Sequence, residues 1–269
     1  MERMISGATV IGEKRCSLVP LEWEDGIRAV RMNESAAAGR SLAHSFATDP
    51  LSQYLLDGDD MEGCSAEAKW KLHVALMTTV IASHASKGLV TTIGPDYDAL
   101  SIWYLASGRR SYVAMAPPGA DTEGLWTMFR SGMLKLYFQL PAEGRKRYYK
   151  EMLPLLHRTK AKIMGERDED SYYLVYIGTK PHARGRGHAT RLIRDMIVKA
   201  DAENRPMYLE SSSLVNNAFY EKFGFQVVGD ILFTRGPVPV KLDVMVREPQ
   251  PRKTADSSAA TSQASSMKV

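Results

Sequence analysis

Small and basic residues alternate over residues 184–191, a pattern suited to binding an anion. Gly185, Gly187 and Ala189 leave the backbone accessible to a ligand. The basic residues among them are Arg184, Arg186, His188 and Arg191. Apolar residues then recur at helical spacing over residues 192–200, so the loop opens into an amphipathic helix whose first amides have no internal partner. A bound polyphosphate would suit this helix start.

The charges at the helix start strengthen this interpretation. The helix dipole favours negative groups there, and each cation costs roughly 0.3–1 kcal/mol. With a polyphosphate bound at the helix start, the same cations would be stabilising. The alternative is a glycine-rich turn that starts a surface helix with solvated arginines. Before the loop, the β-rich run at residues 172–179 predicts a largely buried strand that Pro181 ends.

The loop resembles the acyl-CoA-binding motif of the GNAT superfamily of N-acyltransferases. That motif is Arg or Gln, two residues, Gly, one residue, then Gly or Ala, and Arg184, Gly187 and Ala189 fill it in order. A second block, residues 207–229, resembles the next strand and helix of the family, ending in Tyr220, Gly224 and Phe225. The two motifs together cover about sixty residues at the expected separation.

The resemblance implies acetyl-CoA as co-substrate and no metal. The strand backbone would bind the pantetheine amides, with an N–H near Ile177 or Gly178 polarising the thioester carbonyl. The loop amides would bind the pyrophosphate, and the arginines would reach the 3'-phosphate. The expected cofactor-binding residues are Ile177, Gly178, Thr179, Arg184, Gly185, Arg186, Gly187, His188, Ala189, Thr190 and Asn217.

Two residues are the candidates for catalysis. Tyr220 matches the family tyrosine beside the CoA sulfur, and a phenol stays protonated at pH 7 and can act as the acid. The alternative for Tyr220 is a core aromatic. Glu210, on the strand at residues 207–211, is the candidate base, with a structural ion pair as its alternative and His44 and Asp49 as weaker bases. Since neither motif contains a cysteine, a ping-pong route through an acyl-cysteine is disfavoured.

The fold class implied is α/β, a GNAT fold with a central mixed, twisted β-sheet flanked by helices. Residues 89–93 and 99–105 predict a hairpin, and about sixty residues then precede the strand at residue 172. We therefore predict a helical insertion, residues 106–168, between the third and fourth strands. It would either form a lid or pocket wall or cap one sheet face. Residues 1–248 would form a single acyltransferase domain and 249–269 a disordered tail.

The remaining elements follow from periodicity and turn residues. A first strand is expected at residues 14–19, and a closing pair of strands at 226–234 and 238–246. Helices are expected at 22–32, 34–46, 66–86, 125–140 and 145–152, the last disturbed by Pro154. Four residues are candidates for substrate contact, or for packing and capping: His44, Phe46, Asp49 and Tyr54.

Composition excludes other classes of protein. The formal charge of +4 over 269 residues, without a basic stripe, argues against nucleic acid as the main partner. Cys16 and Cys64 have no metal-binding spacing, which fits a reducing compartment. No run approaches eighteen apolar residues, so neither a membrane span nor secretion is indicated, and the cytoplasm is the expected location. A homodimer is left open.

The leading hypothesis is an enzyme of the EC 2.3.1 class, an N-acetyltransferase that moves an acetyl group from acetyl-CoA to a primary amine of a small molecule by direct attack. One alternative is a protein acetyltransferase that acts on lysines or N-termini. Another is a non-catalytic acyl-CoA-binding regulator. These residues leave the acceptor, the acyl chain length and the oligomeric state open.

Overall fold

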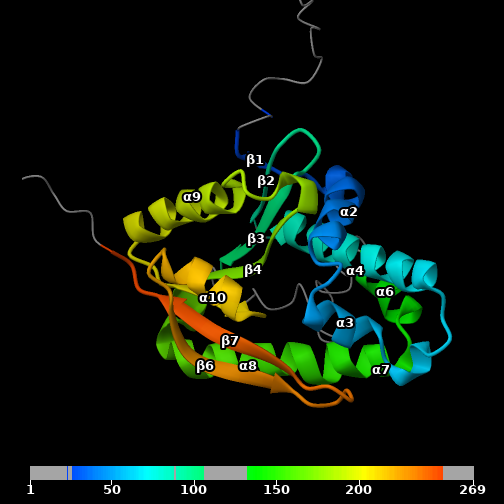
Figure 1. Cartoon of the computed structure of the whole chain (residues 1–269). Helices are drawn as coiled ribbons and strands as arrows, with labels where there is room; N and C mark the ends of the chain where they lie inside the picture. The colour runs from blue at the N-terminus through cyan, green and yellow to red at the C-terminus, as the bar shows by residue number, and fades with distance from the viewer. Residues whose placement is uncertain (1–22, 24–25, 88, 106–131, 251–269) are drawn as a thin grey trace, which may run out of the picture.

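The computed structural model describes residues 23, 26–87, 89–105 and 132–250. Over these residues seven strands form one sheet in the order β1-β2-β3-β4-β5-β7-β6 (Figure 1). Only β4 and β5 pair in parallel, so the predicted mixed sheet is confirmed. The strands are β1 (Arg28–Ala29), β2 (Leu89–Ile93), β3 (Ala99–Leu105), β4 (Tyr172–Thr179), β5 (Met207–Ser211), β6 (Gln226–Phe233) and β7 (Val240–Arg247).

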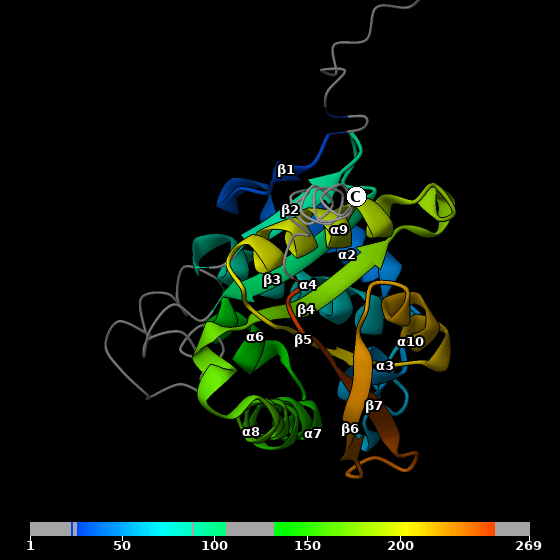
Figure 2. The ribbon, with the colours of Figure 1, turned by 90° about the vertical axis from the view of Figure 1, so that its left-hand side faces the viewer.

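Helices cover both faces of the sheet (Figures 1 and 2). The α-helices are α2 (Ser35–Ser45), α3 (Pro50–Leu56), α4 (Ala66–Lys87), α6 (Met133–Gln139), α7 (Ala142–Arg145), α8 (Leu153–Met164), α9 (His188–Ala202) and α10 (Leu214–Glu221). A π-helical segment, Lys146–Met152, joins α7 to α8, and 3-10 turns lie at Met32–Glu34, Asp59–Met61, Gly165–Asp170 and Pro181–Ala183.

The alternation of side chains along the strands divides the core into two layers. Met207, Leu209 and Met245 pack with α9 and α10. Tyr208 and Val244, which point the other way, pack in the core formed by α2, α3, α4, α6 and α8. The central strands are thus buried on both faces, as their largely apolar sequences predict.

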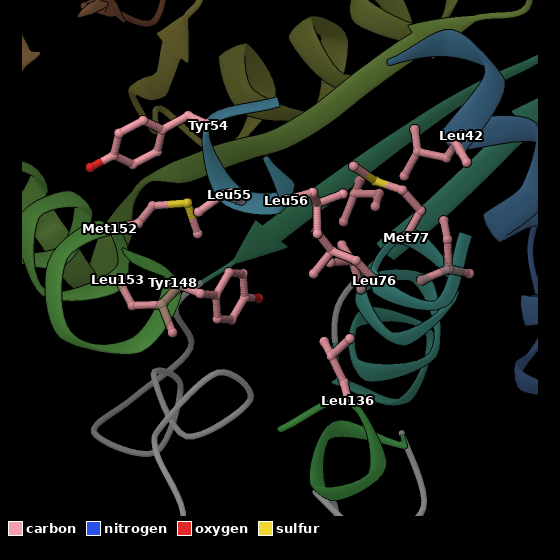
Figure 3. Packing of buried hydrophobic residues seen from close by; sticks show 14 of the residues in the cluster. Leu42, Tyr54, Leu55, Leu56, Leu76, Met77, Leu136, Tyr148, Met152 and Leu153 are labelled. Atoms are coloured by element: carbon pink, nitrogen blue, oxygen red, sulfur yellow. The ribbon is translucent and has the colours of Figure 1, made fainter. Parts of the chain in front are cut away.

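The predicted helical insertion is confirmed for the residues that the structure describes, while residues 106–131 lie outside them. Its helices share one core with α3 and α4, where Leu136, Tyr148 and Leu153 meet Leu55 and Leu76 (Figure 3). Pro154 does not end the helical run. The backbone is π-helical just before it, and Pro154 lies in the first turn of α8, where the missing N–H is tolerated.

Near the N-terminus the structure departs from the predicted helix. The helix expected over residues 22–32 is wrong at its end, because Arg28 and Ala29 pair with Thr92 and Thr91 of β2. A long-range strand pairing has overridden the local helical pattern there. The strand expected at residues 14–19, and the tail from residue 251 onward, lie outside the described residues.

A β-bulge in β4, where this strand pairs with β3, marks the point at which β4 and β5 separate. Trp103 pairs with Leu174 and Ile102 with Tyr176, so Val175 has no counterpart on β3. The parallel pairing of β4 with β5 stops at Leu174, just before this extra residue. A bulge bends its strand and increases its twist, and here it turns the end of β4 away from β5. Among the residues that the structure describes, one backbone edge of β4 therefore has no strand partner beyond the bulge.

No helix in the described part of the chain is long and apolar enough to cross a membrane.

Candidate active site

A groove of about 810 Å³ occupies the opening between the ends of β4 and β5. Its walls come from the end of β4, the end of α2, the loop before α9, and α10. The residues that line it include Ser45, Phe46, Ile177, Gly178, Thr179, Arg184, Gly185, Gly187, His188, Ala189, Thr190, Asn216 and Tyr220. Most of the predicted cofactor-binding residues therefore line one groove.

The glycines of the loop are explained by backbone conformation. Gly185 and Gly187 have φ angles of +79° and +78°, in the left-handed region that other residues seldom adopt. A Cβ at either position would meet no atom within 4 Å, so steric room within the protein does not require glycine there.

Gly187 is also the N-cap of α9 and supplies no side-chain acceptor. The first amides of α9, those of His188, Ala189 and Thr190, cannot bond within the helix, and all three residues line the groove. Their position favours an anionic ligand.

Arg184 ties the rim of the groove together. Its Nε donates to the carbonyl of Thr179 at 3.3 Å, and its Nη2 donates to the carbonyl of Ser45 at 3.4 Å. The side chain thus joins the end of β4 to the end of α2. Arg186 is exposed and is not among the residues that line the groove.

Gly178 allows α2 to approach β4 closely. A Cβ there would lie 2.7 Å from the Cβ of Ser45 and 2.9 Å from Cε2 of Phe46, closer than real carbon atoms come. The small residue lets Phe46 reach the groove, and the Phe46 ring also stands edge-on to Tyr176, a pocket residue, at a centroid distance of 5.2 Å.

A smaller pocket of about 100 Å³ lies on the insertion side of the sheet. Its wall combines apolar residues of the π-helical segment and α8 with polar residues of β4 and β5. The lining includes Asp49, Leu51, Met152, Leu153, Leu156, His157, Tyr173, Tyr176, Glu210, Ser211 and Leu242. The insertion is therefore both a pocket wall and a packing layer, because Met152 and Leu153 also belong to the core.

The groove and the pocket meet. The residues that line both are Phe46, Asp49, Ile177, Ser212, Asn216 and Tyr220. Tyr220 is 7% exposed, and burial raises the pKa of its phenol above the ordinary value of 10. A phenol that stays protonated at this junction can donate a proton to a group in the groove.

Glu210 lines the pocket from β5, and burial raises the pKa of its carboxyl from 4.5 to about 7. The hydroxyls of Tyr173 and Tyr208 and the charge of Lys160 oppose this rise in the pKa. A carboxyl with a pKa near neutrality is suited to accept a proton from an amine.

The other predicted residues are placed as follows. Asn217 does not line the groove. It is 6% exposed and its Nδ2 donates to Asp243 at 2.7 Å, whereas its neighbour Asn216 lines both the groove and the pocket. Asp49 caps α3 by accepting from the amide of Ser52 at 2.9 Å.

Two more candidates for substrate contact pack elsewhere. The ring of His44 lies 4.8 Å from that of Trp70, and the Tyr54 hydroxyl donates to Glu151. Neither residue lines the groove or the pocket.

Sequence reasoning missed the pocket residues of α8 and β4, namely Leu156, His157, Tyr173 and Tyr176. The apolar spacing of Leu153 and Leu156 could have indicated a buried face on α8. Within the described residues, no group of three or more His, Cys, Asp or Glu side chains could hold a metal ion.

The chain is similar to known acetyltransferases in sequence and in fold. The family model "Acetyltransferase (GNAT) domain" matches residues 158–227, which include the loop and Tyr220. An uncharacterized N-acetyltransferase of Schizosaccharomyces pombe is 33% identical over 232 residues, which cover 86% of this chain and 87% of that protein.

Two solved structures are similar in fold. The first, described as histone acetyltransferase HPA2 and related acetyltransferase from Corynebacterium glutamicum, has a TM-score of 0.52 and 15% identity, and covers 86% of this chain and 99% of that chain. Arylalkylamine N-acetyltransferase 2 from Aedes aegypti has a TM-score of 0.49 and 14% identity, over 83% of this chain and 98% of that chain.

Proposed function

Since the chain belongs to the GNAT family of N-acetyltransferases, we propose that it transfers the acetyl group of acetyl-CoA to a primary amine of a small molecule. One observation carries the proposal. The groove that begins at the loop before α9 meets, at Tyr220, a pocket that contains the carboxyl of Glu210. A donor and an acceptor can thus approach each other from two sides.

The groove supports the donor part of the proposal. The pyrophosphate of acetyl-CoA would lie on the amides of His188, Ala189 and Thr190, at the positive end of the α9 dipole. The pantetheine amides would bond to the free backbone edge of β4 at residues 177–179, beyond the bulge. An amide at Ile177 or Gly178 would polarise the thioester carbonyl.

The pocket supports a small, cationic acceptor. The helices of the insertion wall it, and its volume of about 100 Å³ suits a modest alkyl or aromatic group better than a folded protein surface. Asp49 and Glu210 supply the negative charge that attracts an ammonium group, and Tyr173 and Tyr176 supply aromatic surface.

Glu210 and Tyr220 would divide the proton transfers between them. Glu210 takes a proton from the ammonium group, and the neutral amine then attacks the thioester carbon. As the C–S bond breaks, the proton of the Tyr220 hydroxyl passes to the departing sulfur. The proton left on the new amide nitrogen and the proton held by Glu210 are released to solvent, and a proton from solvent restores Tyr220, so that one proton is released per turnover.

The test measures thiol release from acetyl-CoA with a panel of alkyl, arylalkyl and diamine acceptors, beside amino acids and lysine peptides. Turnover with a small amine is expected, and Tyr220→Phe should lower kcat by about 10²–10⁴-fold. Tyr137→Phe is the matched control, because Tyr137 lies on α6 and lines neither cavity. Turnover only with peptides would instead support a protein acetyltransferase.

We also propose that residues 1–248 form a single acyltransferase domain that acts in the cytoplasm. The common core of the insertion with α3 and α4 supports the first part. A protease-resistant fragment that ends near residue 105 would contradict it.

A further inference from the structure

Lys160 of α8 is a buried cation that neither the groove nor the pocket exposes. Only 2% of the residue is exposed, and lysine is seldom buried to this extent unless it is paired. Its Nζ donates to the carboxylate of Asp168 at 2.5 Å and to the carbonyl of the same residue at 2.7 Å. A buried pair of this kind costs desolvation energy, so stability alone does not explain it.

The rings of two tyrosines pack between Lys160 and the side of the pocket that Glu210 lines. The Nζ of Lys160 is 6.0 Å from the ring centroid of Tyr173 and 5.7 Å from that of Tyr208. These two residues pair across the parallel junction of β4 and β5, and their rings meet edge to face at 5.4 Å. Both hydroxyls favour the ionised form of the Glu210 carboxyl. The insertion thus reaches the Glu210 side of the pocket through Lys160 and two aromatic rings.

The charged and titratable groups around Glu210 come from each element packed there. Tyr173 and Tyr176 act on it from β4, Tyr208 from its own strand and Lys160 from α8, whereas β7 presents Val244 opposite it. Asp49 also lines the pocket. Asp168 favours the charged form of Lys160, and the charge of Lys160 in turn lowers the pKa of His157. Lys160 is the one cation that acts directly on the Glu210 carboxyl among these groups.

We propose that Lys160 is a positioning residue of the acceptor site, which holds the rings of Tyr173 and Tyr208 in place beside Glu210. The positive charge of Lys160 favours the ionised, basic form of that carboxyl. The inference rests on the proposed function in so far as Glu210 is the base. It gives the helical insertion a part in the chemistry beyond walling the pocket. A merely structural Lys160 would tie α8 to the turn Gly165–Asp170 and leave the titration of Glu210 unchanged.

The test follows the titration of Glu210 itself, by ¹³C NMR of protein labelled at the glutamate δ-carbon, with Glu210→Gln to assign the signal. Lys160→Met removes the charge and keeps much of the stem. We expect the titration midpoint to rise by about one pH unit, because an opposite charge near a carboxyl favours its ionised form. Lys162→Met, at an exposed position of the same helix, is the matched control and should leave the midpoint unchanged.

The variant Lys160→Met could leave Asp168 unpaired and fail to fold. The double variant Lys160→Met with Asp168→Asn removes both charges together and is expected to raise the midpoint by a smaller amount. An unchanged or lowered midpoint in either folded variant overturns the proposal. Because this measurement needs no turnover, it stands even if acetyl transfer fails. In an active enzyme, the acid limb of the kcat/KM profile should move to higher pH in parallel.

Discussion

Glu210→Gln should make the protein more stable at alkaline pH while it removes the proposed base. Burial raises the pKa of the Glu210 carboxyl from 4.5 to about 7, so the folded protein holds this proton more tightly than the unfolded chain does. Between these two values the folded state binds more protons, and the free energy of unfolding therefore falls as pH rises. Glutamine carries no such proton and should not show this loss.

The magnitude follows from the two pKa values. A rise from 4.5 to about 7 corresponds to about 3 kcal/mol against the folded state above pH 7. Since the carboxyl opens onto the pocket, we expect the free energy of unfolding of Glu210→Gln to exceed that of the wild type by about 1–3 kcal/mol, which corresponds to a rise of about 3–10 °C in Tm. The gain should be small at pH 5 and complete by pH 8.

The assay is urea unfolding of the wild type and Glu210→Gln across this pH range. Burial also lowers the pKa values of His73, His84 and His157, so the stabilising contribution of their neutral imidazoles is lost as pH falls. Both proteins contain them, so their effect cancels in the difference. Glu221→Gln, an exposed residue of α10, is the matched control and should show no pH-dependent gain. Equal stability of Glu210→Gln and wild type at pH 8 would refute the reasoning.

Three further predictions follow from the site. The acid limb of the kcat/KM profile should lie near pH 7 and disappear in the residual activity of Glu210→Gln, and a limb near pH 4.5 would show that Glu210 is an ordinary surface-like carboxyl. Gly178→Ala should cost about 1–3 kcal/mol in chemical unfolding because α2 must move, whereas Gly229→Ala, whose nearest neighbour lies at 3.4 Å, should cost less. Asn217→Ala should lower stability by about 1–2 kcal/mol through loss of its bond to Asp243 yet leave the KM for acetyl-CoA unchanged, and a raised KM would return Asn217 to the donor site.

Local signals predicted the central part of the fold well. The bounds of β4 and β5 agree with the predicted strands at residues 172–179 and 207–211, because each is an apolar run ended by turn residues. The start of α9 was equally readable, since the glycines at 185 and 187 both mark positive φ angles. These features depend on neighbours in the sequence, which a pattern can report.

Features that depend on distant pairing were not predictable in the same way. β1 exists because residues 28–29 pair with β2, and the opening of the sheet depends on an extra residue of β4, Val175, which has no counterpart on β3. Asn216 and Asn217 are neighbours in the sequence but point to different sides of α10. Asn216 lies one turn before Tyr220 and shares its side, whereas Asn217 is turned toward Asp243 on β7. The acceptor pocket likewise needs α8 folded back onto β5.

The most direct test of the central claim is a calorimetric titration with acetyl-CoA of the wild type, Ala189→Glu and Ala202→Glu. Ala189 lines the groove at the start of α9, and Ala202 is the exposed last residue of the same helix, about 20 Å away. The same substitution thus places a carboxylate beside the proposed phosphate site or far from it. We predict micromolar binding to the wild type and to Ala202→Glu, and at least about tenfold weaker binding to Ala189→Glu. Equal binding to all three proteins, or none to the wild type, would contradict the donor site described above.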